Sequence, residues 1–259
     1  MTKILWINPL GSDEFDLPIA DALATESDAR IDVASLSEGP RNLDYNSSAA
    51  VVAKETLGVI RWAEEESYDA AIIGCFYDPY LRAAREITTD LVVAAPAESS
   101  LRLASTLGDS YSILVGGRKN VPEMHENVVR YGHENKLASF RVLGIGVNGY
   151  QGDLETTRRR MFEEARAAVE EDRADAIVLG CTAQFGLYRE LQDELQVPVI
   201  DSAVAALRYA EFLVDARERN GWRVSKASGF EAPPSGELQQ WIPAVRPERL
   251  IVRSEWREL

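Results

Sequence analysis

The stretch Asp69–Cys75, with the sequence DAAIIGC, occurs a second time as Asp175–Cys181, with the sequence DAIVLGC. Each copy is an Asp-Ala pair, a short aliphatic run and then Gly-Cys. A short apolar run bounded by glycine is typical of a strand buried in a parallel sheet. Sixteen residues after each cysteine a further apolar segment begins, at Leu91 and at Val197. The equal offset indicates that the chain contains two copies of one unit.

The same order of elements extends upstream of both motifs. Apolar or extended segments lie at 3–7 and 31–34 in the first copy, and at 111–115 and 140–144 in the second. Helical stretches rich in Ala, Glu and Arg follow at 49–66 and 155–172. This alternation predicts parallel sheets with helices on both faces. We expect an α/β fold of two pseudo-symmetric halves, each a parallel four-stranded sheet with flanking helices.

The repeat also predicts the domain organisation. Residues 1–110 form the first half, with Cys75, and residues 111–216 form the second, with Cys181. The last helix, 202–216, packs on its own half or back onto the first. Residues 217–259 lie outside both copies. We expect this C-terminal extension to wrap over the first half or to contact a second copy, with a lid over the active site as the alternative.

The two cysteines, the only ones in the chain, stand at equivalent strand ends. Ligands of open parallel sheets bind beyond the carboxyl ends of the strands. Two facing halves would place one thiol on each side of a shared cleft, where we expect the active site. A thiolate removes a proton from one face of a carbon acid and a thiol delivers one to the other. The sequence therefore predicts a racemase that needs no cofactor and no metal.

Both cysteines are predicted to lie in turns that lead into helix starts, where a thiol ionises more easily. Asp78-Pro79 is typical of an N-cap followed by a first-turn proline, and Thr182 is placed to cap a helix near Gln184. We expect the cysteine pKa to fall toward neutrality. The backbone N–H groups after each cysteine, the Thr182 hydroxyl and the Asn8 amide are candidates to stabilise the enolate oxygen.

Four segments together carry a resemblance to a known family: Asn8-Pro9, Gly74–Pro79 (GCFYDP), Cys181-Thr182 and Val197–Asp201 (VPVID). They resemble the aspartate/glutamate/hydantoin racemase superfamily over about residues 3–215. The first cysteine motif looks most like the hydantoin and allantoin racemase branch, where Phe, an acid and Pro follow the cysteine. The resemblance implies racemisation by Cys75 and Cys181 without a cofactor, two α/β halves with the site between them, and a homo-oligomer.

The resemblance also suggests substrate-binding residues, and the chain departs from the branch at two loops. Phe76, after the first cysteine, and Glu98, beside the site, are implied together with Asn8 and Thr182. The branch usually continues Asn-Pro with Asn and Thr or Ser, whereas Leu10-Gly11-Ser12 follows here. We expect Ser12 to replace the lost hydroxyl.

The second departing loop is Gly116-Gly117-Arg118, where relatives often carry a threonine. Arg118 can hold a carboxylate through two hydrogen bonds. This favours an amino-acid or dicarboxylate substrate over a neutral hydantoin.

Four functions are compatible with these residues. The first is racemisation of a carbon acid of the hydantoin or allantoin type. The second is racemisation of aspartate or glutamate, and the third is chemistry like that of maleate isomerases or decarboxylases in the same fold. The fourth, from another class, is a non-catalytic α/β module that binds a small molecule and uses both cysteines only for packing.

Composition excludes several partners. The chain has 259 residues, 46% of them apolar, and a net charge of −14 from 42 acidic and 28 basic residues. A chain this acidic is a poor match for nucleic acid, which binds cations, and for anionic membrane surfaces. No apolar segment reaches the roughly 18 residues of a membrane span, and the N-terminus does not resemble a signal peptide. We expect a cytoplasmic protein with a small-molecule substrate.

Overall fold

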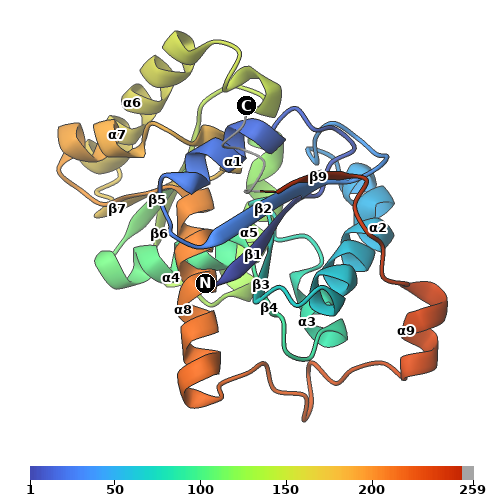
Figure 1. The fold of residues 1–259 in the computed structure, drawn as a ribbon. Helices are drawn as coiled ribbons and strands as arrows, with labels where there is room; N and C mark the ends of the chain where they lie inside the picture. Colours follow the sequence, from blue (N-terminus) through green and yellow to red (C-terminus); the bar gives the residue numbers. More distant parts are fainter. Residues whose placement is uncertain (253–259) are drawn as a thin grey trace. The chain divides into compact units, whose positions relative to one another are not determined.

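The computed structural model describes residues 1–252 of the chain (Figure 1). Internal contacts divide the chain into two compact units. Of the described residues, unit 1 comprises 1–74, 79–95 and 207–252, and unit 2 comprises Cys75–Asp78 and Pro96–Ala206. The Cys75 loop therefore groups with the second unit, although the strand before it belongs to the first. Among the helices within residues 1–252, none combines the length and apolar character that a bilayer span requires.

Unit 1 is built on a sheet with the strand order β4-β3-β1-β2-β9. Its strands are β1 (Lys3–Asn8), β2 (Arg30–Ser35), β3 (Ala70–Ile73), β4 (Val92–Ala94) and β9 (Arg249–Ile251). Its helices are α1 (Asp16–Ala24), α2 (Asn46–Glu65), α3 (Leu81–Ile87), α9 (Ser235–Trp241) and the C-terminal part of α8 (Ser202–Asn220). The central strand β1 is fully buried from Ile4 to Ile7, as its unbroken apolar sequence requires.

The first sheet has a fifth strand that the repeat does not predict. Strand β9 comes from the C-terminal extension and pairs with β2 in antiparallel orientation. It covers the edge of β2, whose backbone groups would otherwise face solvent. The extension is also tied to α2, because Val245 N–H donates to the Gly58 carbonyl at 2.9 Å and Arg61 donates to the carbonyls of Leu238 and Ile242.

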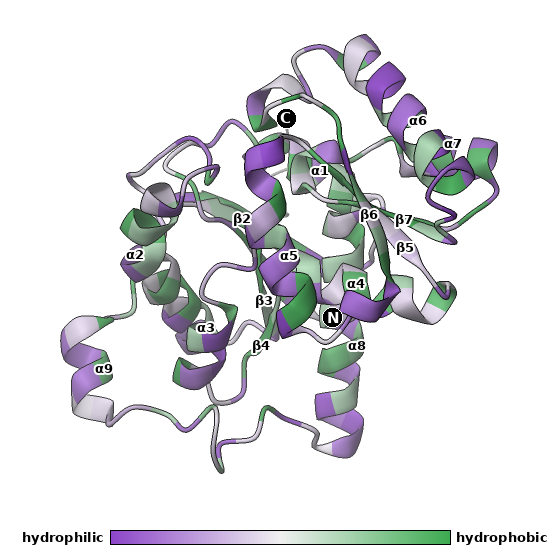
Figure 2. Ribbon diagram, turned by 180° about the vertical axis from the view of Figure 1, so that it is seen from behind, coloured by the Kyte–Doolittle hydropathy of each residue, from purple (hydrophilic) through white to green (hydrophobic). Residues whose placement is uncertain are grey.

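Unit 2 is built on a parallel sheet with the strand order β6-β5-β7-β8. Its strands are β5 (Tyr111–Val115), β6 (Leu137–Val142), β7 (Ala176–Leu179) and β8 (Val199–Ile200). Its helices are α4 (Pro96–Leu107), α5 (Val121–Arg130), α6 (Leu154–Glu170), α7 (Tyr188–Leu195) and the first residues of α8, with four short 3-10 turns: η1 (Arg118–Asn120), η2 (Glu134–Lys136), η3 (Val147–Gly149) and η4 (Thr182–Gln184). Apolar residues lie along the strands, whereas helix α6 carries a strongly polar stretch (Figure 2).

The two sheets repeat one plan, as the duplicated motif predicts. In unit 1 the strand before Cys75 pairs with central β1, with Ile7 opposite Ile73. In unit 2 the strand before Cys181 pairs with central β5, with Leu114 opposite Leu179. All four of these strands run parallel to their partners. The predicted α/β fold with two parallel-sheet halves and flanking helices is confirmed.

Gly74 shows why glycine precedes the first cysteine. Its N–H donates to the Ile7 carbonyl at 2.8 Å, and a Cβ there would lie 2.4 Å from Nε1 of the buried Trp6. Overpacking a rigid core costs about 1–3 kcal/mol, so we expect G74A to lower the free energy of unfolding in urea by that amount. The matched control is G146A, because a Cβ at Gly146 meets nothing within 4 Å. Equal stability of the two variants would contradict this packing.

Candidate functional site

Both cysteines lie two residues beyond the last residue of a buried strand, Ile73 of β3 and Leu179 of β7. The glycine before each one continues the hydrogen bonding to the central strand; Gly180 N–H donates to the Leu114 carbonyl at 2.9 Å. A Cβ at Gly180 would come within 2.7 Å of that carbonyl oxygen. Both cysteines belong to unit 2, are half-buried and form no disulfide.

The loop after Cys75 is held in an unusual backbone conformation. Asp78 and Tyr80 have φ angles of +48° and +62°, a region that costs non-glycine residues of order 1–3 kcal/mol each. Inside the loop, Asp78 N–H donates to the Cys75 carbonyl at 2.9 Å. Such strain persists only where surrounding contacts hold it.

Helix α5 and turn η1 supply some of those contacts through Tyr77. Asn127 Nδ2 donates to the Tyr77 carbonyl at 2.7 Å, and Asn120 Nδ2 donates to the Tyr77 hydroxyl. Asn120 is itself fixed, because its Oδ1 accepts from Gly117 N–H at 2.8 Å. The Cys75 loop is therefore bound to the segment that follows β5.

Asp78 anchors the same loop to the start of α4. Its carboxylate accepts from the N–H groups of Ala97 and Glu98 at 2.8 and 2.7 Å, and from the Tyr131 hydroxyl at 2.8 Å. The expectation that Asp78 caps the helix directly after it is wrong. Helix α3 begins only at Leu81, and the carboxylate instead binds free N–H groups at the start of another helix, where an anion is stabilised.

The Asp78 carboxyl is buried, with 2% of the residue exposed. Burial raises its pKa to about 7, and the charge of Glu98 adds to this shift. Hydrogen bonds from Glu98, Ala97 and Tyr131 act in the opposite direction, because they stabilise the ionised form. Burial and the Asp78 charge in turn raise the pKa of Tyr131, so that its hydroxyl remains a donor.

The expectation that the pKa of Cys75 falls toward neutrality is wrong. Burial raises the pKa of the Cys75 thiol, and the negative charges of Cys181, Asp78 and Glu123 raise it further. The Tyr77 backbone N–H points to the thiol and lowers the pKa, but by less than burial raises it. Cys75 is therefore a protonated thiol at neutral pH, and Cys181 lies near enough to act on it electrostatically.

The Cys181 turn is a short 3-10 helix, η4, rather than a capped α-helix. Thr182 is its first residue and is half-buried, while α7 begins only at Tyr188; Thr182 therefore does not precede a helix as the sequence suggested. Gln184 N–H donates to the Cys181 carbonyl at 3.0 Å, and Gln184 Nε2 donates to the hydroxyl of the buried Tyr150 at 2.9 Å.

Three further predicted residues belong to unit 2 with the cysteines. Phe76 is buried in the Cys75 loop. Glu98 donates its backbone N–H to Asp78, while its carboxylate pairs with Arg102 at 3.0 Å. Arg118 begins turn η1 and is exposed. The structure thus connects Glu98 to the Cys75 loop through its backbone.

The other two predicted residues, Asn8 and Ser12, belong to unit 1. Asn8 ends β1 and is buried, and its amide is hydrogen-bonded to Trp6 and Asp16. Ser12 is half-buried, and its hydroxyl accepts from Glu14 N–H at 3.3 Å. The roles of both residues toward a substrate stay predictions.

Sequence reasoning missed the residues that hold the cysteine loop. Asn120, Asn127 and Tyr131 lie more than 40 residues after Cys75 and belong to no motif. Only their polar character next to apolar helix positions could have drawn attention to them. Within residues 1–252, no group of three or more His, Cys, Asp or Glu side chains is arranged to hold a metal ion.

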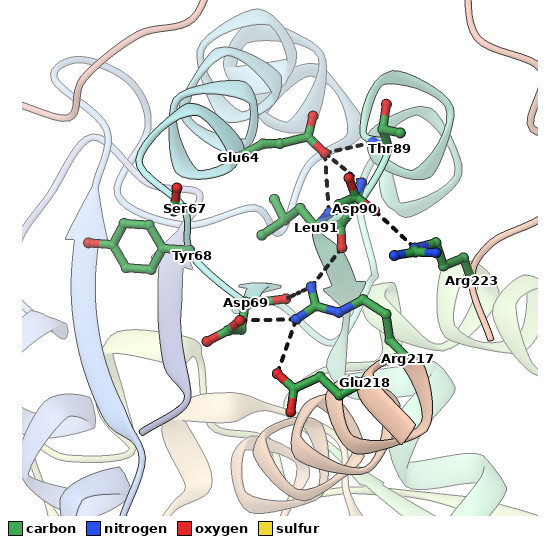
Figure 3. A pocket seen from close by; sticks show the side chains of 10 residues that line it. All are labelled: Glu64, Ser67, Tyr68, Asp69, Thr89, Asp90, Leu91, Arg217, Glu218 and Arg223. Atoms are coloured by element: carbon green, nitrogen blue, oxygen red, sulfur yellow. Dashed lines mark hydrogen bonds and ion pairs between the residues drawn. The ribbon is translucent and has the colours of Figure 1, made fainter. Parts of the chain in front are cut away.

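A separate pocket of about 590 Å³ lies in unit 1, at the amino ends of β3 and β4 (Figure 3). Its polar groups bind one another. Arg217 donates to Asp69 and to the Asp90 carbonyl, Arg223 pairs with Asp90, and one Glu64 oxygen accepts from three successive backbone N–H groups. These interactions join α8 to the sheet, and we assign the pocket no substrate.

Comparison with known proteins places this architecture in a family. The family model described as Asp/Glu/Hydantoin racemase matches residues 4–210. Hydantoin racemase from Paenarthrobacter aurescens is 34% identical over 234 residues, which is 89% of this chain and 97% of that protein. Hydantoin racemase from Pseudomonas sp. (strain NS671) is 34% identical over 222 residues, 86% of each chain.

A solved structure agrees with these sequence matches. Allantoin racemase from Klebsiella pneumoniae superposes with a TM-score of 0.85 at 27% identity, covering 94% of this chain and 100% of that one. These likenesses agree with the strand order that the two sheets share and with the Gly-Cys pair that follows a buried strand in each half. The chain belongs to the Asp/Glu/hydantoin racemase family.

Proposed function

We propose that the protein is a racemase for carbon acids of the hydantoin or allantoin type, with Cys75 and Cys181 as its acid and base and no cofactor. One observation carries the proposal. The two cysteines follow equivalent strands, group in one unit, and are close enough for the charge of Cys181 to raise the pKa of Cys75. The names of the similar hydantoin and allantoin racemases supply the substrate class.

The protonation of Cys75 assigns a starting role to each thiol. Cys75 begins as the acid, since burial keeps its proton in place. Cys181 as thiolate takes the proton from the stereogenic carbon, and the electron pair of that C–H bond passes into the adjacent carbonyl as an enolate. Cys75 then gives its proton to the opposite face of the carbon and becomes the thiolate. The same steps in reverse convert the other enantiomer.

Nearby backbone groups suit the charges that this cycle creates. The Tyr77 N–H stabilises Cys75 when it becomes a thiolate, because a hydrogen bond to the charged form favours that form. The enolate oxygen needs its own donors, and Thr182, which belongs to the same unit as both cysteines, is the side chain that we assign to it. The direct test follows the optical rotation of an enantiopure 5-substituted hydantoin or of allantoin with purified protein. Decay to zero is expected, and a constant rotation with every such compound would overturn the proposal.

Arg118 supports an amino-acid substrate as the second candidate. It is exposed in η1, and no carboxylate within residues 1–252 forms an ion pair with it. If the substrate is an acidic amino acid, R118A removes a bidentate ion pair and raises KM for that substrate by about 10- to 100-fold. The control is R159A, which removes another exposed arginine of unit 2, on α6. An unchanged KM in R118A would eliminate this candidate, whereas activity on hydantoins is expected to be unaffected.

A further inference from the structure

Asn127 is a polar residue on the buried face of an amphipathic helix. Helix α5 buries the side chains of Met124, Asn127 and Val128, and Asn127 is exposed by only 3%. Spacings of three and four residues place all of them on one face of the helix. A carboxamide in such a position is costly unless its polar atoms are hydrogen-bonded. Packing alone would be served better by an apolar side chain, so Asn127 needs another explanation.

The explanation is a hydrogen bond to the loop that carries Cys75. Asn127 Nδ2 donates to the Tyr77 carbonyl at 2.7 Å. A carbonyl oxygen can only accept, so the amide nitrogen must face it and the orientation of the carboxamide is fixed. Asn127 and the segment Cys75–Asp78 both belong to unit 2. The contact therefore lies within one compact unit.

The same loop directs a backbone N–H at the Cys75 thiol. Asp78 N–H donates to the Cys75 carbonyl at 2.9 Å, which closes a β-turn with Phe76 and Tyr77 as its central residues. An acceptor in the side chain of the first turn residue binds the N–H of the third, as oxygens do in Asx and ST turns. The Cys75 sulfur takes the place of that oxygen, and the Tyr77 N–H is hydrogen-bonded to it.

Tyr77 is thus held through its backbone and its side chain together. Its N–H binds Cys75, its carbonyl accepts from Asn127, and its hydroxyl accepts from Asn120 Nδ2. These groups leave the residue by bonds that meet at or beside one Cα. The direction of the N–H can therefore change only if the carbonyl or the ring moves as well.

We propose that Asn127 is a positioning residue for Cys75, which holds the Tyr77 peptide so that its N–H stays directed at the sulfur. The inference rests on the proposed function for its consequence, because Cys75 becomes a thiolate when it gives up its proton. A hydrogen bond to the charged form stabilises that form. Without the Asn127 donor, the buried Tyr77 carbonyl loses a partner and the turn is free to move away from the thiol.

The kinetic test compares N127A and N127D with wild type on an enantiopure hydantoin. N127A is expected to lower kcat by about 10-fold, because a hydrogen bond to a charged group is weakened. KM is expected to stay within about twofold, since a buried helix residue that acts through Tyr77 does not bind substrate. N127D keeps the volume of the side chain, so it tests the hydrogen bond without leaving a cavity.

The pH profile of N127D separates positioning from packing. An ionised carboxylate cannot donate to the Tyr77 carbonyl, whereas a protonated carboxyl can. The kcat of N127D relative to wild type is therefore expected to rise as pH falls from about 8 to about 5. The ratio for N127A is expected to stay level, because alanine does not titrate. A wild-type kcat in N127A, or a ratio for N127D as low and as level as that of N127A, overturns the inference.

The matched control is T157V. Thr157, on α6, is also a buried residue of unit 2 whose side chain donates to a backbone carbonyl, that of Tyr150 at 3.0 Å. Valine keeps the shape of the side chain and removes the donor. T157V is expected to lower stability and to leave kcat within about twofold of wild type. An equal fall of kcat in N127A and T157V would reduce the role of Asn127 to stability.

A second readout does not depend on activity. The Tyr77 N–H resonance is followed by ¹H–¹⁵N NMR in wild type, C75A, N127A and T157V. C75A removes the sulfur and shows where the resonance lies without that acceptor. N127A is expected to move the resonance toward the C75A position, and T157V is expected to leave it in place.

The two readouts distinguish the positioning role from the proposed function. An unmoved Tyr77 resonance in N127A overturns the positioning role even if no hydantoin is a substrate. A shift toward the C75A position, together with no racemisation by wild type, supports the positioning role and places the failure in the proposed function.

Discussion

C75A and C181A are each expected to abolish racemisation, with kcat reduced by at least about 100- to 10,000-fold, the range of a lost general acid or base. Inversion needs a proton acceptor on one face and a donor on the other, and alanine supplies neither. The measurement is the optical rotation of an enantiopure 5-substituted hydantoin over time. A single alanine variant that racemises at the wild-type rate would contradict the mechanism.

The two variants also separate the two faces of the substrate. In C75A the proposed base, Cys181, is still present, so we expect it to exchange the α-proton of one enantiomer for solvent deuterium without inverting it. C181A is expected to exchange the opposite enantiomer only as the pH is raised, because Cys75 must first lose its proton. Wild-type thermal unfolding in both variants is the control, because each substitution removes a single sulfur atom from a half-buried residue. Exchange of the same enantiomer by both variants would contradict the assignment.

D78A is expected to cost about 2–4 kcal/mol of unfolding free energy and most of the activity, because it leaves the buried donors of Ala97, Glu98 and Tyr131 without their carboxylate. The Cys75 loop, which carries two left-handed residues, loses its anchor to α4 at the same time. D78N keeps one acceptor oxygen and is expected to cost less. Y131F removes a single one of the three bonds and serves as the graded control.

The buried Asp78 carboxyl is expected to make the stability of the protein depend on pH. Its folded-state pKa is raised from 3.8 to about 7, so the folded state binds more protons than the unfolded state between these values. The contribution of Asp78 to stability is therefore greatest below pH 4 and is lost as pH rises through 7. The destabilisation of D78N relative to wild type, measured in urea, is expected to shrink over this interval. A difference that is constant from pH 4 to pH 8 would contradict the burial of this carboxyl.

The strands and the cysteine positions could be predicted because they depend on local sequence. Runs such as Ala70–Ile73 and Ala176–Leu179 are apolar without interruption, as strands buried on both faces must be. The glycine that follows each run is required by the close approach of the central strand. The repeat then located equivalent cysteines without any knowledge of the sheets.

Features that depend on distant residues could not be predicted in this way. Asp78 has the sequence context of a cap for the following helix, but the carboxylate caps α4, 19 residues later in the chain. Strand β9 pairs with β2 across more than 200 residues. The hydrogen bonds of Asn8 to Trp6 and Asp16 depend on where α1 begins and on the space that Gly74 leaves.

The pKa of Cys75 shows how a local rule can fail in a folded protein. A turn that leads toward a helix lowers the pKa of an exposed thiol. Burial disfavours the thiolate more strongly here, and three neighbouring acidic groups act in the same direction as burial. In the proposed cycle this protonated thiol is the proton donor of the first step.

The central claim is that two cysteines move one proton across a stereocentre, and proton NMR in D₂O tests it most directly. Enantiopure 5-substituted hydantoins, allantoin, aspartate and glutamate are incubated with wild type, C75A and C181A. The account predicts that wild type removes the α-proton signal of a hydantoin or allantoin and its optical rotation together, and that neither variant removes the rotation. Loss of rotation in either alanine variant, or an unchanged α-proton signal for every compound with wild type, would contradict it.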